Sequence, residues 1–178
     1  MPELIRTPKV LHIYEYPSPV LSKVSLPVVQ SIKDDLELQD FINDLTYTMQ
    51  YHRAIGIAAP QTGVHLRVLV VQDERQEPIK VINPVIKDTD GESWREEGCL
   101  SIPGLYTKIR RPEEVTIQYF NENGEIKTTI NNGLLGRAIL HEMDHLSGLT
   151  IFDKLSKVER QIVTRKWKLI KRKFAKPA

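Results

Sequence analysis

The stretch Leu134–Gly148, LLGRAILHEMDHLSG, decides the fold and locates the chemistry. His141 and His145 are one helical turn apart, so both imidazoles lie on one helix face and can bind a single metal ion. Glu142, next to His141, can take a proton from a water that the metal holds. This arrangement is typical of a metal-dependent hydrolase.

The residues around these histidines predict a buried helix. They are apolar on nearly every side: Leu134, Leu135, Ala138, Ile139, Leu140, Met143 and Leu146. A helix that is apolar all round belongs in a protein core. Two histidines and two carboxylates, Glu142 and Asp144, are costly in that environment unless they bind a metal or hydrogen-bond to partners.

Such a metal site needs a third protein ligand, and hydrolase classes differ in where it comes from. In the pattern HExxHxxGxxH the third histidine would fall at Ile151, so the sequence excludes that class. A thermolysin-like protease takes a glutamate well downstream. Only Asp153 and Glu159 follow the motif as acidic residues, without a second motif around them, which gives that class little support.

The single cysteine, Cys99, lies in EEGCLSIPG, which we interpret as a glycine-bracketed loop upstream of the helix. Two interpretations are open. A lone cysteine can be a small buried apolar residue. It can also supply a thiolate that completes a Cys-His-His site with an open fourth position, the catalytic form of such a site.

A third segment, AIGIAAPQTG at Ala54–Gly63, combines small residues with Pro60 and Gln61. Together, AIGIAAPQ, EGCLS and HEMDH, in this order, resemble the three signature motifs of peptide deformylases. These enzymes remove the N-terminal formyl group from newly made proteins. The resemblance also covers YPSPVLSKVSLPV, INPVI and RRPEEVTIQYFNENGE, so it spans nearly the whole chain.

Three positions depart from the family pattern. Ala54 stands where glycine is usual, Leu140 where glutamine is usual, and Gly136 where alanine is more familiar. None of them is a metal ligand. The extra methyl of Ala54 could narrow the substrate groove, and Leu140 could remove a hydrogen bond near the metal.

The resemblance implies a role for each motif. The expected metal ligands are Cys99, His141 and His145, with Glu142 as general base and Gln61 and the backbone N–H of Leu100 as oxyanion donors. One thiolate and two imidazoles suit Fe²⁺, Zn²⁺, Ni²⁺ or Co²⁺. The family usually uses Fe²⁺, so one ferrous ion per chain is the expected cofactor.

The expected substrate is an N-formylmethionyl nascent peptide. The family binds the peptide as an added strand, and Gly56 suits main-chain hydrogen bonding in that mode. We expect the methionine pocket to be formed by Ile55, Leu134, Ala138 and the His141 ring, with Arg137 at its rim. We also expect Glu97 to pair with Arg111 and so hold the cysteine loop.

The chain of 178 residues is long enough for one packed core, so we predict a single domain, residues 1–178. Apolar periodicity predicts a helix over residues 36–53. Strands are predicted at 65–72 and 79–86, and a hairpin at 115–120 and 126–130. The predicted fold class is α+β. Antiparallel or mixed sheets surround a buried central helix with the HExxH motif, and a helix in the N-terminal half and a C-terminal helix complete the fold.

The tail from Arg160 carries eight basic and no acidic residues, whereas the preceding residues carry 17 basic and 23 acidic ones. Val163, Trp167, Ile170 and Phe174 predict an amphipathic helix at about 157–175. It is either a docked terminal helix or, as in bacterial deformylases with a basic C-terminal helix, a contact for ribosomal RNA.

One cysteine and the lack of a long apolar run predict a cytoplasmic protein without a membrane partner. Two other functions stay open at this point. One is an HExxH metallopeptidase, and the other is a ribosome-binding module without catalysis.

Overall fold

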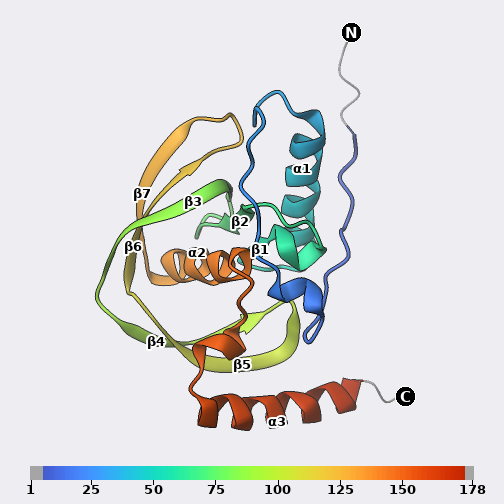
Figure 1. Ribbon diagram of the computed structural model, residues 1–178, viewed down its shortest axis with the longest axis vertical. Helices are drawn as coiled ribbons and strands as arrows, with labels where there is room; N and C mark the ends of the chain where they lie inside the picture. The colour runs from blue at the N-terminus through green and yellow to red at the C-terminus, as the bar shows by residue number, and fades with distance from the viewer. Residues whose placement is uncertain (1–5, 175–178) are drawn as a thin grey trace.

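The computed structural model describes residues 6–174, and of Phe174 only the backbone. The elements follow in this order: a 3-10 helix η1 (Pro19–Ser22), α1 (Leu36–Tyr51), β1 (Gly56–Ala58), a 3-10 helix η2 (Ala59–Thr62), β2 (Val68–Gln72), β3 (Pro78–Asp90), β4 (Ser93–Cys99), β5 (Ile102–Arg111), β6 (Glu114–Phe120), β7 (Ile126–Asn132), α2 (Gly133–Leu146), a 3-10 helix η3 (Ile151–Lys154) and α3 (Lys157–Phe174). The strands pair antiparallel, which confirms the α+β class (Figure 1).

The strands form a five-stranded sheet, in the order β1-β2-β3-β6-β7, and a two-stranded sheet of β4 and β5. The smaller sheet continues the larger one. The β3–β6 ladder ends at the pair Asp90 and Glu114, and the β4–β5 ladder begins at Ser93 and Arg111. Residues 91–92 and 112–113 therefore form a bend between the sheet and the β4–β5 hairpin.

The segment around Cys99 differs from the loop expected from the sequence. Cys99 is the last residue of β4 and pairs with Ile102 across a short turn. The strand pairing that continues from the main sheet holds this segment extended. The thiol therefore lies on the end of a hairpin.

Strand β2 lies between two helices, which explains its unbroken apolar sequence. Val68 and Val70 pack with α1, while Leu69 and Val71 pack with α2. All four side chains are fully buried. Figure 1 shows β3, β6 and β7 curving around α2 on the side away from α1. Both helices are thus fixed against one strand.

The predicted helices and strands agree with the structure, with small differences at their ends. Helix α1 ends at Tyr51, two residues before the predicted end, and β2 starts at Val68. Strand β3 runs four residues beyond its predicted end, to Asp90, because β6 continues to pair with it.

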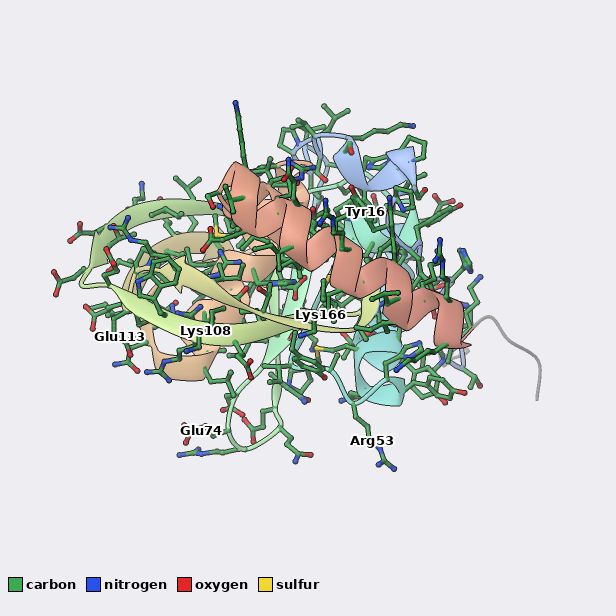
Figure 2. The ribbon with its side chains drawn as sticks, turned by 90° about the horizontal axis from the view of Figure 1, so that it is seen from below. Tyr16, Arg53, Glu74, Lys108, Glu113 and Lys166 are labelled. Atoms are coloured by element: carbon green, nitrogen blue, oxygen red, sulfur yellow. The ribbon has the colours of Figure 1, made fainter. Side chains whose placement is uncertain are left out.

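Helix α3 packs on the hairpin through part of the predicted apolar stripe. Val163, Trp167 and Ile170 contact the cluster formed around Ile109 and Phe152, and Trp167 is buried. Figure 2 shows α3 lying across the hairpin, and the Lys166 ammonium donates to the Tyr106 carbonyl at 3.4 Å. The stripe's last member, the Phe174 side chain, and residue 175 of the predicted helix lie outside the described residues. None of the helices within residues 6–174 has both the length and the apolar character needed to cross a bilayer.

Gly136 allows α2 to start close to the end of β7. A Cβ atom at this position would lie 2.6 Å from the Asn131 carbonyl oxygen, which belongs to the backbone and cannot rotate away. We expect Gly136→Ala to lower the free energy of unfolding by about 1–3 kcal/mol through this overlap. Urea denaturation of both chains measures this change in the free energy of unfolding. A gain in stability, as helix propensity alone predicts, would contradict the close contact.

Candidate metal centre and active site

The three predicted metal ligands lie together, although Cys99 comes from strand β4 and the two histidines come from helix α2. One donor atom each from Cys99, His141 and His145 lies within 4.8 Å of the others. The Cys99 Sγ is 3.2 Å from Nε2 of His145, and the two imidazole rings are 5.1 Å apart. Both histidines are buried, at 8% and 2% exposure. The β4–β5 hairpin thus delivers the sulfur to the helix that carries the imidazoles.

The donor set fits a divalent transition metal. The Nδ1 of His141 is hydrogen-bonded to the Glu97 carboxylate at 2.9 Å, which leaves Nε2 for a metal. Among residues 6–174, Nδ1 of His145 has no hydrogen-bond partner although it is buried. Burial is the largest cause that lowers the pKa of His145, so this imidazole is held neutral, as a metal ligand must be.

Glu97 is the centre of a buried ionic cluster. Its carboxylate accepts hydrogen bonds from Arg111 at 2.5 and 2.8 Å, as predicted, and from Arg137 at 2.6 Å. Arg111 also donates to Asp144 at 2.8 Å. Burial raises the pKa of Glu97, but the hydrogen bonds from His141 and Arg111 outweigh it and hold the pKa at about 2. Glu97 is therefore ionised and links β4 to α2.

We expect Glu97→Gln to lower the free energy of unfolding of the metal-free chain by about 3–5 kcal/mol at neutral pH, because two buried guanidinium groups lose their carboxylate. The pKa of Glu97 is depressed from 4.5 to about 2. Its stabilisation is therefore complete above about pH 4.5 and is lost as the pH falls toward 2. Denaturation curves at several pH values should show the difference shrinking in that window. The matched control is Glu96→Gln, at the exposed neighbouring glutamate. A difference in unfolding free energy that does not depend on pH, or an equal loss of unfolding free energy in Glu96→Gln, would contradict this role.

Glu142 has the surroundings of a general base. Its side chain is 5% exposed, and within the described part of the chain its Oε2 has no hydrogen-bond partner. Burial raises the pKa of this carboxyl to about 7, near the value that suits proton transfer at neutral pH. A Cβ atom on Gly56 would lie 2.6 Å from Oε1. Gly56 thus leaves space for this carboxylate, a role that the sequence did not reveal.

Gln61 lies beside the cysteine. Its Oε1 accepts from the Ala58 N–H at 2.8 Å, and its Nε2 donates to the Ser101 hydroxyl at 3.1 Å and lies 3.6 Å from the Cys99 Sγ. Ser101, which is fully buried, was not among the predicted site residues. The sequence feature that could have indicated Ser101 is its position two residues after Cys99, in the same motif.

The N-terminal segment joins the two motifs that contain Gln61 and Ser101. The Tyr14 N–H donates to the Gln61 carbonyl at 2.8 Å, and the Tyr16 N–H donates to the Ser101 carbonyl at 2.9 Å. These two bonds align the first and second motifs side by side.

A cavity of about 770 Å³ opens at this centre. The predicted substrate-binding residues all line it: Ile55, Gly56, Leu134, Arg137 and Ala138. Ile55 and Leu134 are partly exposed, whereas Arg137 is buried. The expected position of Arg137 at the rim is therefore wrong, because its guanidinium binds Glu97 and the hairpin backbone. Further lining residues were not predicted: His12, His52, Arg53, Glu96, Leu105 and Tyr106.

Residues 10–161 match the sequence model of a family described as polypeptide deformylase. The chain belongs to this family. A peptide deformylase of Thermodesulfovibrio yellowstonii is 40% identical over 163 residues, covering 89% of this chain and 97% of the relative. One from Neisseria meningitidis is 42% identical over 160 residues, covering 89% and 94%.

Solved structures agree with this assignment. The peptide deformylase of Legionella pneumophila superposes with a TM-score of 0.85 at 37% identity, covering 94% of this chain and 99% of that one. The Ehrlichia chaffeensis peptide deformylase in complex with actinonin superposes with a TM-score of 0.84 at 33% identity, covering 94% and 99%. The chain is therefore a hydrolase, and the predicted removal of the formyl group from nascent peptides is confirmed.

Proposed function

We propose that this deformylase hydrolyses N-formylmethionyl peptides with one divalent ion, Fe²⁺ in the cell, held by Cys99, His141 and His145 on the buried helix that carries the HExxH motif. The observation that carries the proposal is the convergence of three donor atoms within 4.8 Å, beside a buried carboxylate and a cavity. When bound, the ion supplies the Lewis acidity that lowers the pKa of water toward ~7 and polarises the formyl carbonyl.

Glu142 moves the proton in this mechanism. It accepts a proton as a water oxygen attacks the formyl carbon, and it delivers that proton to the amine nitrogen as the C–N bond breaks. The products are formate and a peptide with a free amino terminus. The raised pKa of Glu142 suits both steps, since the same group must accept and release a proton near neutral pH.

Gln61 and the Leu100 backbone N–H stabilise the negative charge on the former carbonyl oxygen. Gln61 is oriented for this role by Ala58 and Ser101, which bind the two ends of its carboxamide. The bonds to Gln61 and Ser101 from the N-terminal segment fix the same geometry.

We expect Gln61→Ala to lower kcat by about 100- to 1,000-fold, the usual cost of one oxyanion donor. Steady-state kinetics on a formyl-Met peptide measures this change. KM should change little, because the interaction forms in the transition state. A loss carried by KM alone would assign Gln61 to substrate binding instead.

The peptide binds along β1, an edge strand of the five-stranded sheet. Gly56 in β1 offers its main chain to the peptide, as an added strand requires. The methionine side chain enters the cavity between Ile55, Leu134, Ala138 and the His141 ring, all of which line it. An unbranched apolar side chain suits these apolar walls.

Product analysis tests the reaction. The purified protein should release formate from formyl-Met-Ala-Ser and leave internal peptide bonds of an unformylated peptide uncut. Cleavage of internal bonds would overturn the proposal in favour of a peptidase. Anaerobic purification followed by metal analysis tests the ion, and unchanged activity after aerobic loss of iron would exclude Fe²⁺.

Helix α3 supports a contact with the ribosome in the cytoplasm. Its basic residues are largely exposed, including Lys168 and Arg172, while Trp167 anchors the helix on the hairpin. Such a surface can neutralise RNA phosphates. The double variant Lys168→Glu/Arg172→Glu should lose sedimentation with ribosomes at low salt and keep deformylase activity on free peptides.

A further inference from the structure

The sulfur lies on the β4–β5 hairpin and the two imidazoles lie on helix α2, and side chains connect these two elements. Cys99 lies at the end of the β4–β5 hairpin, whereas α2 packs on the five-stranded sheet. The hairpin leaves that sheet at the bend of residues 91–92 and 112–113. At about 3.3 Å per residue, β4 places Cys99 roughly 20 Å from the bend. A small rotation at the bend therefore moves the sulfur far relative to the imidazoles.

Arg137 connects α2 to both strands of this hairpin. It lies one helical turn before His141 and is 4% exposed. One terminal nitrogen donates to Glu97 Oε1 at 2.6 Å and to the Ile109 carbonyl at 3.0 Å. The other donates to the Ser93 carbonyl at 3.1 Å and to the Ser93 hydroxyl at 2.8 Å. These contacts reach the start of β4, the residue two before Cys99, and β5.

The charge of Glu97 does not by itself require Arg137. Arg111 already binds both oxygens of that carboxylate, and Asp144 is paired with Arg111 and with Lys154 at 2.7 Å. A second buried guanidinium adds a desolvation cost that its attraction to Glu97 need not offset. What the guanidinium adds is a planar fork that holds several acceptors in fixed directions.

We propose that Arg137 is a positioning residue for metal binding: it fastens the β4–β5 hairpin to α2 so that the Cys99 thiolate meets His141 and His145. The proposal rests on the metal site proposed above. It assigns Arg137 a role away from the substrate, although the residue lines the cavity. The same guanidinium that holds Ser93 at the base of the hairpin holds Glu97 near its end.

The test is a titration of the metal-free Arg137→Met chain with Co²⁺, against a competing chelator. Met keeps the length of the side chain and leaves the Glu97–Arg111 pair in place. Dissociation constants and the thiolate-to-cobalt absorption band are both recorded, and circular dichroism checks the fold. We expect Co²⁺ binding to weaken about 10- to 100-fold, the usual cost of losing a group that orients metal ligands. The thiolate band per bound ion should also weaken.

Two matched variants separate positioning from charge. Arg110→Met removes an exposed arginine of the same hairpin that pairs with Glu92, and it should bind Co²⁺ like the unaltered chain. Arg137→Lys keeps the charge but not the fork, and it should weaken binding by an intermediate factor. If Arg137→Met does not fold, Ser93→Ala, which removes one of the four contacts, should weaken binding about 2- to 10-fold.

Unchanged Co²⁺ affinity and an unchanged thiolate band in Arg137→Met would overturn the proposal. If Arg137→Met does not fold, an unchanged Co²⁺ affinity in Ser93→Ala would overturn it. Two other outcomes would refute the metal site itself: no thiolate band in the unaltered chain, or a Cys99→Ala chain that binds Co²⁺ as tightly as the unaltered chain.

Discussion

The Glu142→Gln variant is expected to lower kcat for formate release by about 100- to 10,000-fold, the range for loss of a general acid–base group. Glutamine keeps the shape of the side chain in its tight place beside Gly56 but cannot accept the proton of the attacking water. Steady-state kinetics on a formyl-Met peptide, with metal content measured on the same sample, checks this expectation.

Metal content separates this effect from damage to the site. Glu142 is not among the three converging donor residues, so Glu142→Gln should keep one ion per chain. Asp144→Asn is the control variant, because it removes a carboxylate from the same helix that pairs with Arg111 and Lys154 and is not the proposed general base. If Glu142→Gln kept most of the activity, another group would have to move the proton, and the role assigned to Glu142 would be refuted.

The Cys99→Ala variant is expected to lose both the metal and at least about 1,000-fold of the activity, because catalysis by the metal and the sulfur ligand disappear together. Two imidazoles remain, and they bind a divalent ion much more weakly than the complete set. Elemental analysis after gel filtration checks the metal, and formate release checks the activity. Partial recovery by added Zn²⁺ or Co²⁺ at high concentration would agree with this account.

The matched control for Cys99→Ala is Ser101→Ala. Ser101 is buried two residues away and binds Gln61 rather than the metal donors. This variant should keep the ion and lose activity only through Gln61. Full activity in a metal-free Cys99→Ala chain would refute the proposed role of the thiolate.

Much of the fold could be predicted from local patterns. Helix α1 follows from its apolar periodicity, and the β6–β7 hairpin from Asn123-Gly124 between two strand-like runs. The convergence of Cys99 on His141 and His145 could be expected only from the family resemblance. The spacing of two histidines shows a helix face, but it does not say which distant residue approaches it.

The β4–β5 hairpin could not be predicted in this way. The β4 sequence, SWREEGC, is mostly polar, and most of its side chains are only partly buried or exposed. The apolar packing of the hairpin comes from β5 and from Phe152 and Trp167, which follow much later in the chain. Pairing continued from β3 and β6, a non-local effect, makes this segment a strand.

The role of Arg137 was also hidden by distance along the chain. In the sequence it is a charged residue on a helix near the expected pocket, and such a residue is usually placed at a solvent boundary. Its partners Ser93, Glu97 and Ile109 lie 28 to 44 residues earlier. Only their arrangement on one hairpin shows that the guanidinium is buried and that both of its terminal nitrogens donate hydrogen bonds.

The placement of Cys99 on a hairpin, away from the helix that holds the histidines, also bears on how the protein resists unfolding. An ion that joins Cys99 to His141 closes a chain loop of roughly 40 residues, which restricts the denatured ensemble much as a covalent cross-link does. With a single cysteine, the chain cannot form such a link by internal oxidation. At the proposed site the ion would therefore stabilise the folded chain as well as take part in catalysis, and its removal should lower the free energy of unfolding together with the activity.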